Sequence, residues 1–208
     1  NNVDNALSFT DTQDGALESI ADILDRMSTL RTSYGSGTAT SSDKASYASE
    51  FKELQKSLNS FTSETFNSLS LFSTGSNSKS VYISTRGDSG ASISISSLNL
   101  SDALSVGGIN LGSAATTAAA SSISQVSIGN LTTAISNVAS LRATSGATSS
   151  RLQFSSDFLA TSKTNLQAAN SRIMDVDIAD EVTNYAKYNV QVYAASAALA
   201  QSNLNMGI

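Results

Sequence analysis

The chain has 208 residues, contains no His, Cys, Trp or Pro, and carries a formal net charge of −5. Without His or Cys it has no Ser–His–Asp triad, no Cys nucleophile and no His or Cys zinc site. The negative charge argues against a nucleic-acid footprint, and no run of about 18 apolar residues suggests a membrane span. We therefore expect no enzyme, no cofactor and no metal site.

The first predicted element is a helix over residues 11–34, preceded by a polar lead-in over residues 1–10. Apolar residues recur in it at three and four positions, which is the spacing of one helix face. They are Leu17, Ile20, Leu24, Met27 and Leu30. Asp11 or Thr12 could cap the start of this helix, and Gly35 ends it.

A second helix is predicted over residues 43–67, with Asp43 as its N-cap. Its apolar face consists of Ala48, Phe51, Leu54, Leu58, Phe61 and Thr65. This pattern is typical of an amphipathic helix packed against a neighbour.

Beyond residue 67 the apolar period changes to two. Val81 and Ile83 alternate with polar residues, and the alternation resumes at Ile93 and Ile95 after the glycine-rich stretch 87–90. Two such runs around a turn predict a β-hairpin over about 79–97. We expect residues 98–112 to form a loop, and residues 114–125 to add a helical turn or two.

A long helix is predicted over about 128–174, because mostly large residues recur there every seven positions. We name these positions the rod seam: Leu131, Val138, Ser145, Leu152, Leu159, Leu166 and Ile173. Mostly small residues follow three positions later, which allows partner helices to approach closely. The helix would be roughly 70 Å long, so other long helices must lie beside it. Such seams occur in intramolecular bundles and in self-assembly surfaces, and both can apply here.

The seven-residue pattern fails after Ile173. The acidic residues Asp175, Asp177, Asp180 and Glu181 lack the glycine and distal glutamate of an EF-hand loop, so we interpret them as the acidic start of a helix. The sequence predicts a break near 175–180 and a separate helix from Glu181 to about Leu204. The predicted fold is mainly α: an elongated rod of long antiparallel helices, similar to a coiled-coil bundle, with a β-hairpin.

Several stretches resemble one protein family. Residues 165–181, reading NLQAANSRIMDVDIADE, and residues 199–203, reading LAQSN, closely resemble the C-terminal region of bacterial flagellin. Residues 141–147, reading LRATSGA, resemble the segment before that region. Residues 14–20 and 24–31 are similar to the N-terminal rod helix of flagellins. The resemblance covers nearly the whole chain.

The resemblance implies a secreted, self-assembling subunit of the bacterial flagellar filament, used for motility. It implies a rod domain over residues 1–180 and the start of a C-terminal inner-tube arm over 181–208. The short stretch 98–112 stands where many flagellins insert outer domains, so the chain resembles a minimal flagellin. Two other interpretations stay open: a hook–filament junction protein of the same fold, and a non-catalytic surface adhesin or binding rod.

The same resemblance implies partners and contact residues. Other flagellin subunits are the expected partners, and a flagellar export chaperone would bind the arm helix. The arm candidates are Val182, Tyr185, Val190, Tyr193 and Leu199. Arg26, Met27 and Leu30 are candidates for a subunit contact or for the motif read by the Toll-like receptor for flagellin. Arg26 and Leu30 match that motif, whereas Asp25, Ser28, Thr29 and Arg31 depart from it.

Overall fold

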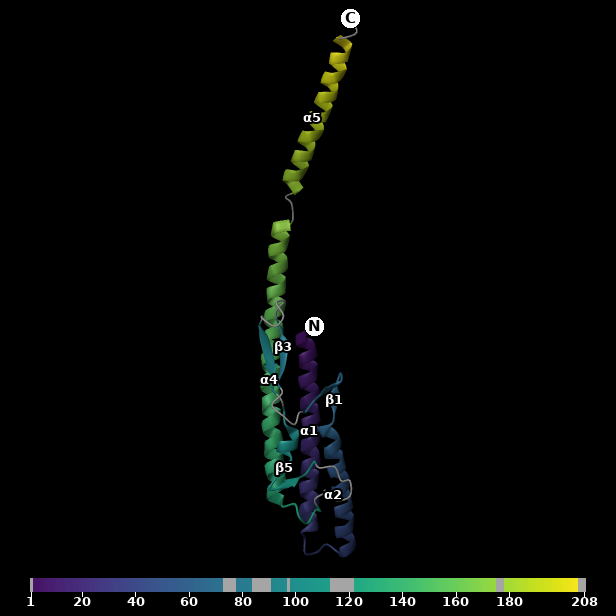
Figure 1. Cartoon of the computed structure of the whole chain (residues 1–208), viewed down its shortest axis with the longest axis vertical. Helices are drawn as coiled ribbons and strands as arrows, with labels where there is room; N and C mark the ends of the chain where they lie inside the picture. Colours follow the sequence, from purple (N-terminus) through teal and green to yellow (C-terminus); the bar gives the residue numbers. More distant parts are fainter. Residues whose placement is uncertain are drawn as a thin grey trace. The chain divides into compact units, whose positions relative to one another are not determined.

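The computed structural model describes residues 2–72, 78–83, 91–96, 98–112, 122–174 and 178–205. The chain forms two compact units, residues 1–159 and residues 160–208. Both units consist mainly of long helices, and the first unit also contains short pairs of strands (Figure 1). The predicted fold class, mainly α with long antiparallel helices and a β-hairpin, is confirmed. Within the described ranges, no helix has a stretch that is both long and apolar enough to cross a membrane.

Helix α1 spans Asn2–Tyr34, so the prediction of a polar lead-in over residues 1–10 is wrong. The buried face of the helix continues toward the N-terminus through Val3, Ala6 and Phe9. Thr10 interrupts the apolar pattern, but its hydroxyl donates to the carbonyl oxygen of Leu7 at 2.9 Å and is satisfied inside the helix. A Thr with this bond can be buried, and therefore it does not end the buried face.

Helix α2 spans Ser41–Thr62 and packs beside α1. Its N-cap is Thr40 rather than Asp43, because the two residues form a capping box. The Asp43 amide donates to the Thr40 hydroxyl at 3.2 Å, and the Thr40 amide donates to the Asp43 carboxylate at 3.0 Å. The two bonds satisfy amides that a helix start leaves without partners.

The predicted end of α2 at residue 67 is also wrong. Strands β1 (Thr65–Phe66) and β2 (Leu69–Ser70) form a small antiparallel pair there. Asn67 and Ser68 make the turn with positive φ angles of 49° and 64°, which fits a two-residue hairpin turn. Thr65 is exposed in β1 and does not extend the buried face of α2.

The predicted β-hairpin is present as strands β3 (Lys79–Tyr82) and β4 (Ser92–Ile95), which pair antiparallel with Val81 opposite Ile93. Ile93 and Ile95 alternate with exposed serines and point into the core. The glycine-rich turn, residues 87–90, and most of the predicted helical turn over 114–125 lie outside the described residues.

The stretch 98–112 is not the predicted loop. It contains the short helix α3 (Leu100–Ala103) and a hairpin of strands β5 (Ser105–Val106) and β6 (Ile109–Asn110). Gly107 and Gly108 have φ angles of 61° and 76°, as a tight turn between two strands requires. A side chain on Gly107 would also approach Asn130 within 3.2 Å.

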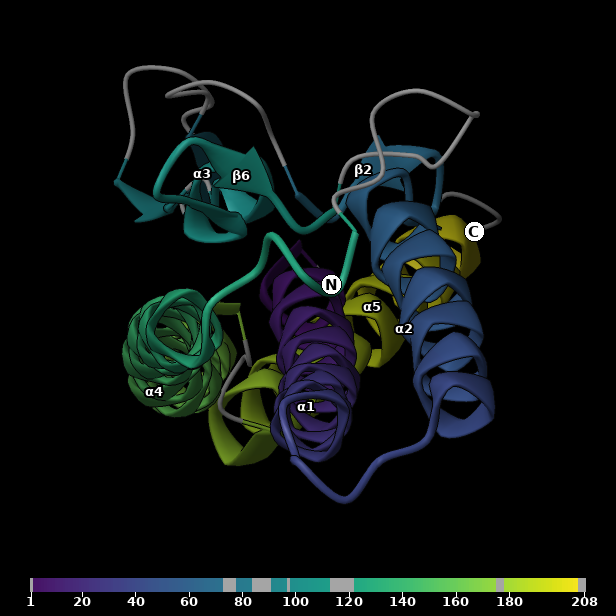
Figure 2. The ribbon, with the colours of Figure 1, turned by 90° about the horizontal axis from the view of Figure 1, so that it is seen from below.

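Helix α4 spans Ile128–Met174, in keeping with the expected helix over about 128–174. Helix α5 spans Ile178–Asn205 and begins three residues before the predicted start at Glu181. Residues 175–177 of the expected break lie outside the described residues, whereas residues 178–180 are already helical, so the predicted extent of the break to residue 180 is wrong. In the first unit, α1 lies between α2 and α4 (Figure 2). Contacts from Thr10 to Ser145 and from Arg31 to Val126 show that α1 and the first part of α4 run antiparallel.

Candidate functional site

The rod seam divides along α4. Leu131, Val138, Ser145 and Leu152 are buried in the core of the first unit, and Leu159 is half-buried against that core. By contrast, Leu166 is 68% exposed and Ile173 is 82% exposed. The same seven-residue spacing therefore forms an internal contact at one end of the helix and an uncovered face at the other.

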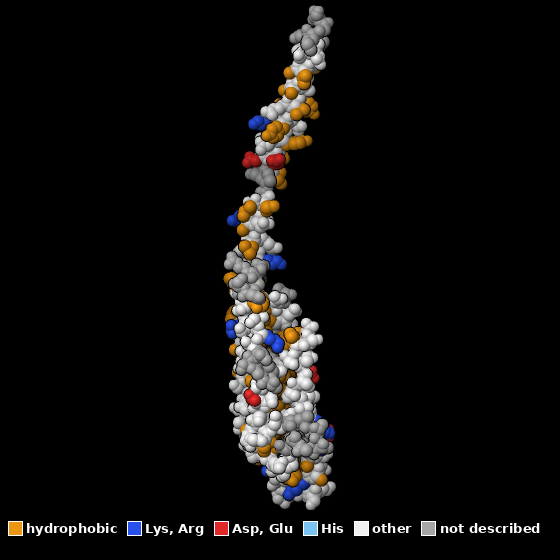
Figure 3. All heavy atoms as spheres, in the orientation of Figure 1, with side chains coloured by type: hydrophobic (Ala, Val, Ile, Leu, Met, Phe, Trp, Pro, Cys, Tyr) orange, Lys and Arg blue, Asp and Glu red, His pale blue; other side chains and the backbone are white. Residues whose placement is uncertain are grey.

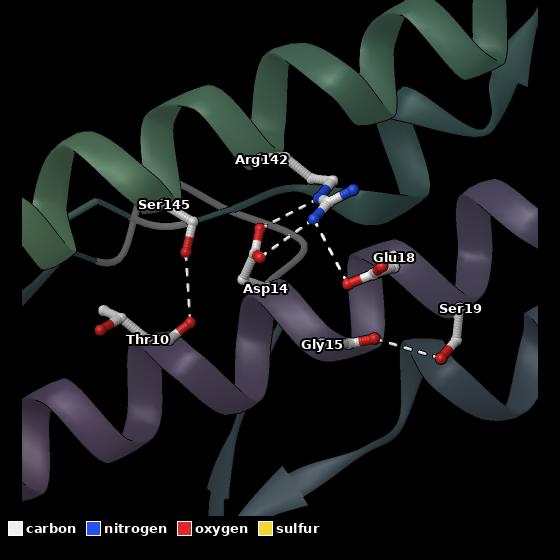
Figure 4. Close-up of polar contacts among 7 residues, drawn as sticks. All are labelled: Thr10, Asp14, Gly15, Glu18, Ser19, Arg142 and Ser145. Atoms are coloured by element: carbon white, nitrogen blue, oxygen red, sulfur yellow. Dashed lines mark hydrogen bonds and ion pairs between the residues drawn. The ribbon is translucent and has the colours of Figure 1, made fainter.

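The buried part of the seam contacts α1 at Ser145. Ser145 donates from Oγ to the backbone oxygen of Thr10 at 3.3 Å (Figure 4), and both residues are buried. Ala134 and Thr148 of the same helix are also buried. Because the bond reaches backbone rather than another side chain, the two helices lie near one another at this level.

An ion pair lies next to this contact. Arg142 on α4 donates from Nε and Nη2 to the two carboxylate oxygens of Asp14 on α1, at 3.0 and 3.1 Å, and Nη2 also reaches Glu18 at 3.5 Å (Figure 4). The hydrogen bond to Asp14 raises the pKa of Arg142 above its usual value. The pair is over a third exposed, so it orients the helices more than it stabilises them.

The three residues of α1 that were candidates for a subunit or receptor contact, Arg26, Met27 and Leu30, lie in two different environments. Arg26 is exposed and donates to Glu50 of α2 at 2.6 Å. This hydrogen bond raises the pKa of Arg26. Met27 and Leu30 are buried in the core. Only Arg26 of the three therefore presents its side chain to a partner.

The arm candidates on α5 lie together on one helix with their side chains exposed. They are Val182, Tyr185, Val190, Tyr193 and Leu199, and Tyr188 and Val192 on the same helix are exposed too. Figure 3 shows apolar side chains along this helix. An apolar face of this extent is typical of a surface that binds another protein.

Two exposed aromatic residues on α4 lie outside the seven-residue spacing of the rod seam. Phe154 and Phe158 do not belong to the rod seam, so the seven-residue spacing gave no reason to single them out. Their spacing of four residues places them on one face of the helix.

The first unit also contains a hollow of about 320 Å³, which we name the hairpin hollow. Its apolar lining consists of Ala6, Phe9, Phe66, Leu69, Val81, Tyr82 and Ile95. The amides of Asn2, Asn5 and Asn67 add polar groups to the lining. Within the described ranges, no group of three or more His, Cys, Asp or Glu could hold a metal ion.

Comparisons with known proteins identify the family of the chain. Residues 1–77 match the model of the bacterial flagellin N-terminal helical region, and residues 128–206 match that of the C-terminal helical region. A flagellin from Listeria innocua is 28% identical over 207 residues, covering 95% of this chain and 72% of the relative. The putative flagellin YvzB from Bacillus subtilis is 45% identical over 74 residues, which cover 36% of this chain and 46% of that protein.

Among solved structures, the flagellin of Bacillus cereus matches with a TM-score of 0.60 and 26% identity, covering 80% of this chain and 93% of that one. Both ends of the chain and most of its length thus agree with one family in sequence and in fold. The chain belongs to the bacterial flagellin family.

Proposed function

We propose that this flagellin, a structural subunit of the extracellular flagellar filament, contacts copies of itself through the apolar faces of α5 and of the end of α4. The observation that carries the proposal is the exposure of Leu166, Ile173 and the arm candidates of α5. Burial of large apolar side chains is favourable by roughly 1.5–3 kcal/mol each. Faces that the single chain leaves open therefore favour association.

The contrast between buried and exposed apolar residues along α4 and α5 also suggests where the rod ends and the arm begins. We propose that residues 1–180 form the rod domain and that residues 181–208 begin the inner-tube arm. The compact units of the single chain divide earlier, after Leu159. Residues 160–180 would then belong to a part of the rod whose seam is completed by neighbouring subunits.

The exposed face of α5 also suits a partner before assembly. We propose that an export chaperone covers this face until the subunit is secreted, because an open apolar helix would otherwise associate prematurely. Around Arg26, recognition by a second subunit or by the Toll-like receptor for flagellin would have to use Arg26 itself. Met27 and Leu30 could contribute only through the core that holds α1 in place.

The direct test is to produce the protein in bacterial cells and to look for filaments by electron microscopy under salting-out conditions. We expect long helical filaments. Isolated monomers at every salt and protein concentration would contradict the proposal. Short caps confined to the hook end of existing filaments would instead favour a hook–filament junction protein.

A further inference from the structure

We propose that Phe154 and Phe158 of one copy insert into the hairpin hollow of a second copy. The proposal rests on the proposed function, since it assigns one specific contact to the assembly of subunits. It joins two features that lie on different elements of the first unit: an aromatic pair on α4 and a hollow built from α1, β1–β2 and β3–β4.

The aromatic pair is exposed in the single chain. Phe154 is 75% exposed and Phe158 is 68% exposed. They follow the buried Leu152 by two and six residues, which places them about 200° and 240° around the helix from it. The pair therefore points away from the core that Leu152 enters, and no described residue of its own unit covers it.

The hollow has the size and chemistry for an aromatic occupant. Its volume of about 320 Å³ lies at the small end of the range for ligand pockets. Phe9 and Phe66 line it as an edge-to-face pair with centroids 6.0 Å apart. A phenyl group entering beside them could extend this arrangement, which is the geometry that aromatic rings prefer. The amides of Asn2, Asn5 and Asn67 provide polar groups around an apolar centre, as protein interfaces do.

The apolar side chains that the first unit leaves exposed support this pairing. Among its described residues, five large apolar side chains are exposed: Leu69, Tyr82, Ile128, Phe154 and Phe158. Two of these form the aromatic pair and two line the hollow. The uncovered apolar surface of the unit is thus concentrated at two places that complement one another.

The arrangement suits a polymer better than a closed dimer. The pair and the hollow are different surfaces, so the contact is heterologous and leaves a free pair and a free hollow at its two ends. Aromatic side chains bury about 150–250 Å² each, whereas a specific stable interface buries roughly 1,200–2,000 Å². This contact alone is too small to hold a dimer. It would contribute when many other contacts repeat beside it along a filament.

Cysteine cross-linking tests the contact directly, because residues 1–208 contain no Cys. Filaments would be sheared from cells that co-express full-length Phe158→Cys and Leu69→Cys variants in a background without other Cys, and then oxidised. We expect a mixed disulfide dimer on a non-reducing gel, at a yield at least tenfold above either variant alone. The matched control replaces Phe158→Cys with Ile128→Cys, an exposed apolar position outside both features. A mixed yield no greater than that of the control would overturn the proposal.

A second measurement uses the polymerisation threshold. We expect Phe154→Gln combined with Phe158→Gln to raise the critical concentration for filament formation about tenfold or more. The melting curve of the monomer by circular dichroism should change little, because both side chains are exposed and Gln is a good helix former. Ile128→Gln is the control, and a critical concentration within twofold of the control would overturn the contact. If the unmodified protein forms no filaments at all, the proposed function itself fails. If the unmodified protein forms filaments and the double variant polymerises like the control, only the contact between the aromatic pair and the hairpin hollow fails.

Discussion

Helix α1 and helix α5 use apolar residues in opposite ways. In α1 one apolar face is buried from Val3 to Leu30 against α2, α4 and the hairpins. In α5 the large apolar side chains from Ile178 to Leu199 are exposed. The comparison teaches that helical periodicity predicts which residues share a face. It does not predict whether the same chain or another copy covers that face.

Amide hydrogen exchange in dilute monomer gives the sharpest form of this comparison. Amides near Ile20 in α1 should exchange only through global opening, which costs about 5–15 kcal/mol in ordinary domains. Amides of α5 should open locally for roughly 1 kcal/mol or less, because helix without tertiary packing is marginal in water. Mass spectrometry of the peptides would measure both, and assembly should slow exchange in α5. Equal protection of the two helices in the monomer would break the comparison.

Two leucines of the rod seam allow the comparison between buried and exposed apolar faces to be tested at single side chains. Leu131→Ala removes a fully buried side chain and should lower the free energy of unfolding by about 2–5 kcal/mol. Leu166→Ala, at an exposed position of the same seam, should change it by no more than about 0.5 kcal/mol. Urea denaturation followed by circular dichroism would measure both. A large loss of stability for Leu166→Ala would mean that the second unit has a packed core of its own.

The ion pair between α1 and α4 should contribute less to the free energy of unfolding than the buried leucine does. A double-mutant cycle with Arg142→Met and Asp14→Asn should give a coupling free energy of about 0.5–1 kcal/mol, since the pair is bidentate but partly exposed. The coupling should shrink in high salt. The pair between Arg26 and Glu50, which is joined by one hydrogen bond and has more exposed side chains, is the matched control with a smaller expected coupling. A larger coupling in the control would reverse this ranking.

The smallest expected effect is a pH dependence at the start of α2. The hydroxyl of Thr40 and then its backbone amide hold the pKa of Asp43 below the ordinary value of 3.8. A folded pKa below the unfolded pKa stabilises the helix start at pH above 3.8, and this contribution is lost as the pH falls through the folded value. Thr40→Ala should raise the Asp43 pKa toward 3.8, which a side-chain carboxyl NMR titration would detect. The idea would be falsified if the midpoint of Asp43 were the same in both proteins.

The sequence predicts the helical fold, the hairpin of β3 and β4, and the long helix α4, because each depends on a local period. It misses the first turns of α1, because Thr10 and Gln13 are polar yet buried. Gln13 is buried through a bond from its Nε2 to the backbone oxygen of Leu71, a residue far away in the chain. Such a partner cannot be read from local spacing.

Two other structural features that the sequence analysis did not predict have recognisable sequence patterns. Thr40 stands three residues before Asp43, which is the spacing of a capping box. Gly107 and Gly108 between Val106 and Ile109 have the composition of a tight hairpin turn. The exposure of Phe154 and Phe158 is different, because no pattern in the chain states that a large aromatic residue on a helix stays uncovered. That fact became visible only in three dimensions.

The bond from Ser145 to the backbone of Thr10 has a mechanical consequence. Long side chains between two helices can rotate and absorb a small displacement, but a hydroxyl that bonds directly to backbone leaves little such slack. A twist or pull applied to α4 at this level would pass to α1 with little loss. The two helices would in this way share a load that falls on either one of them.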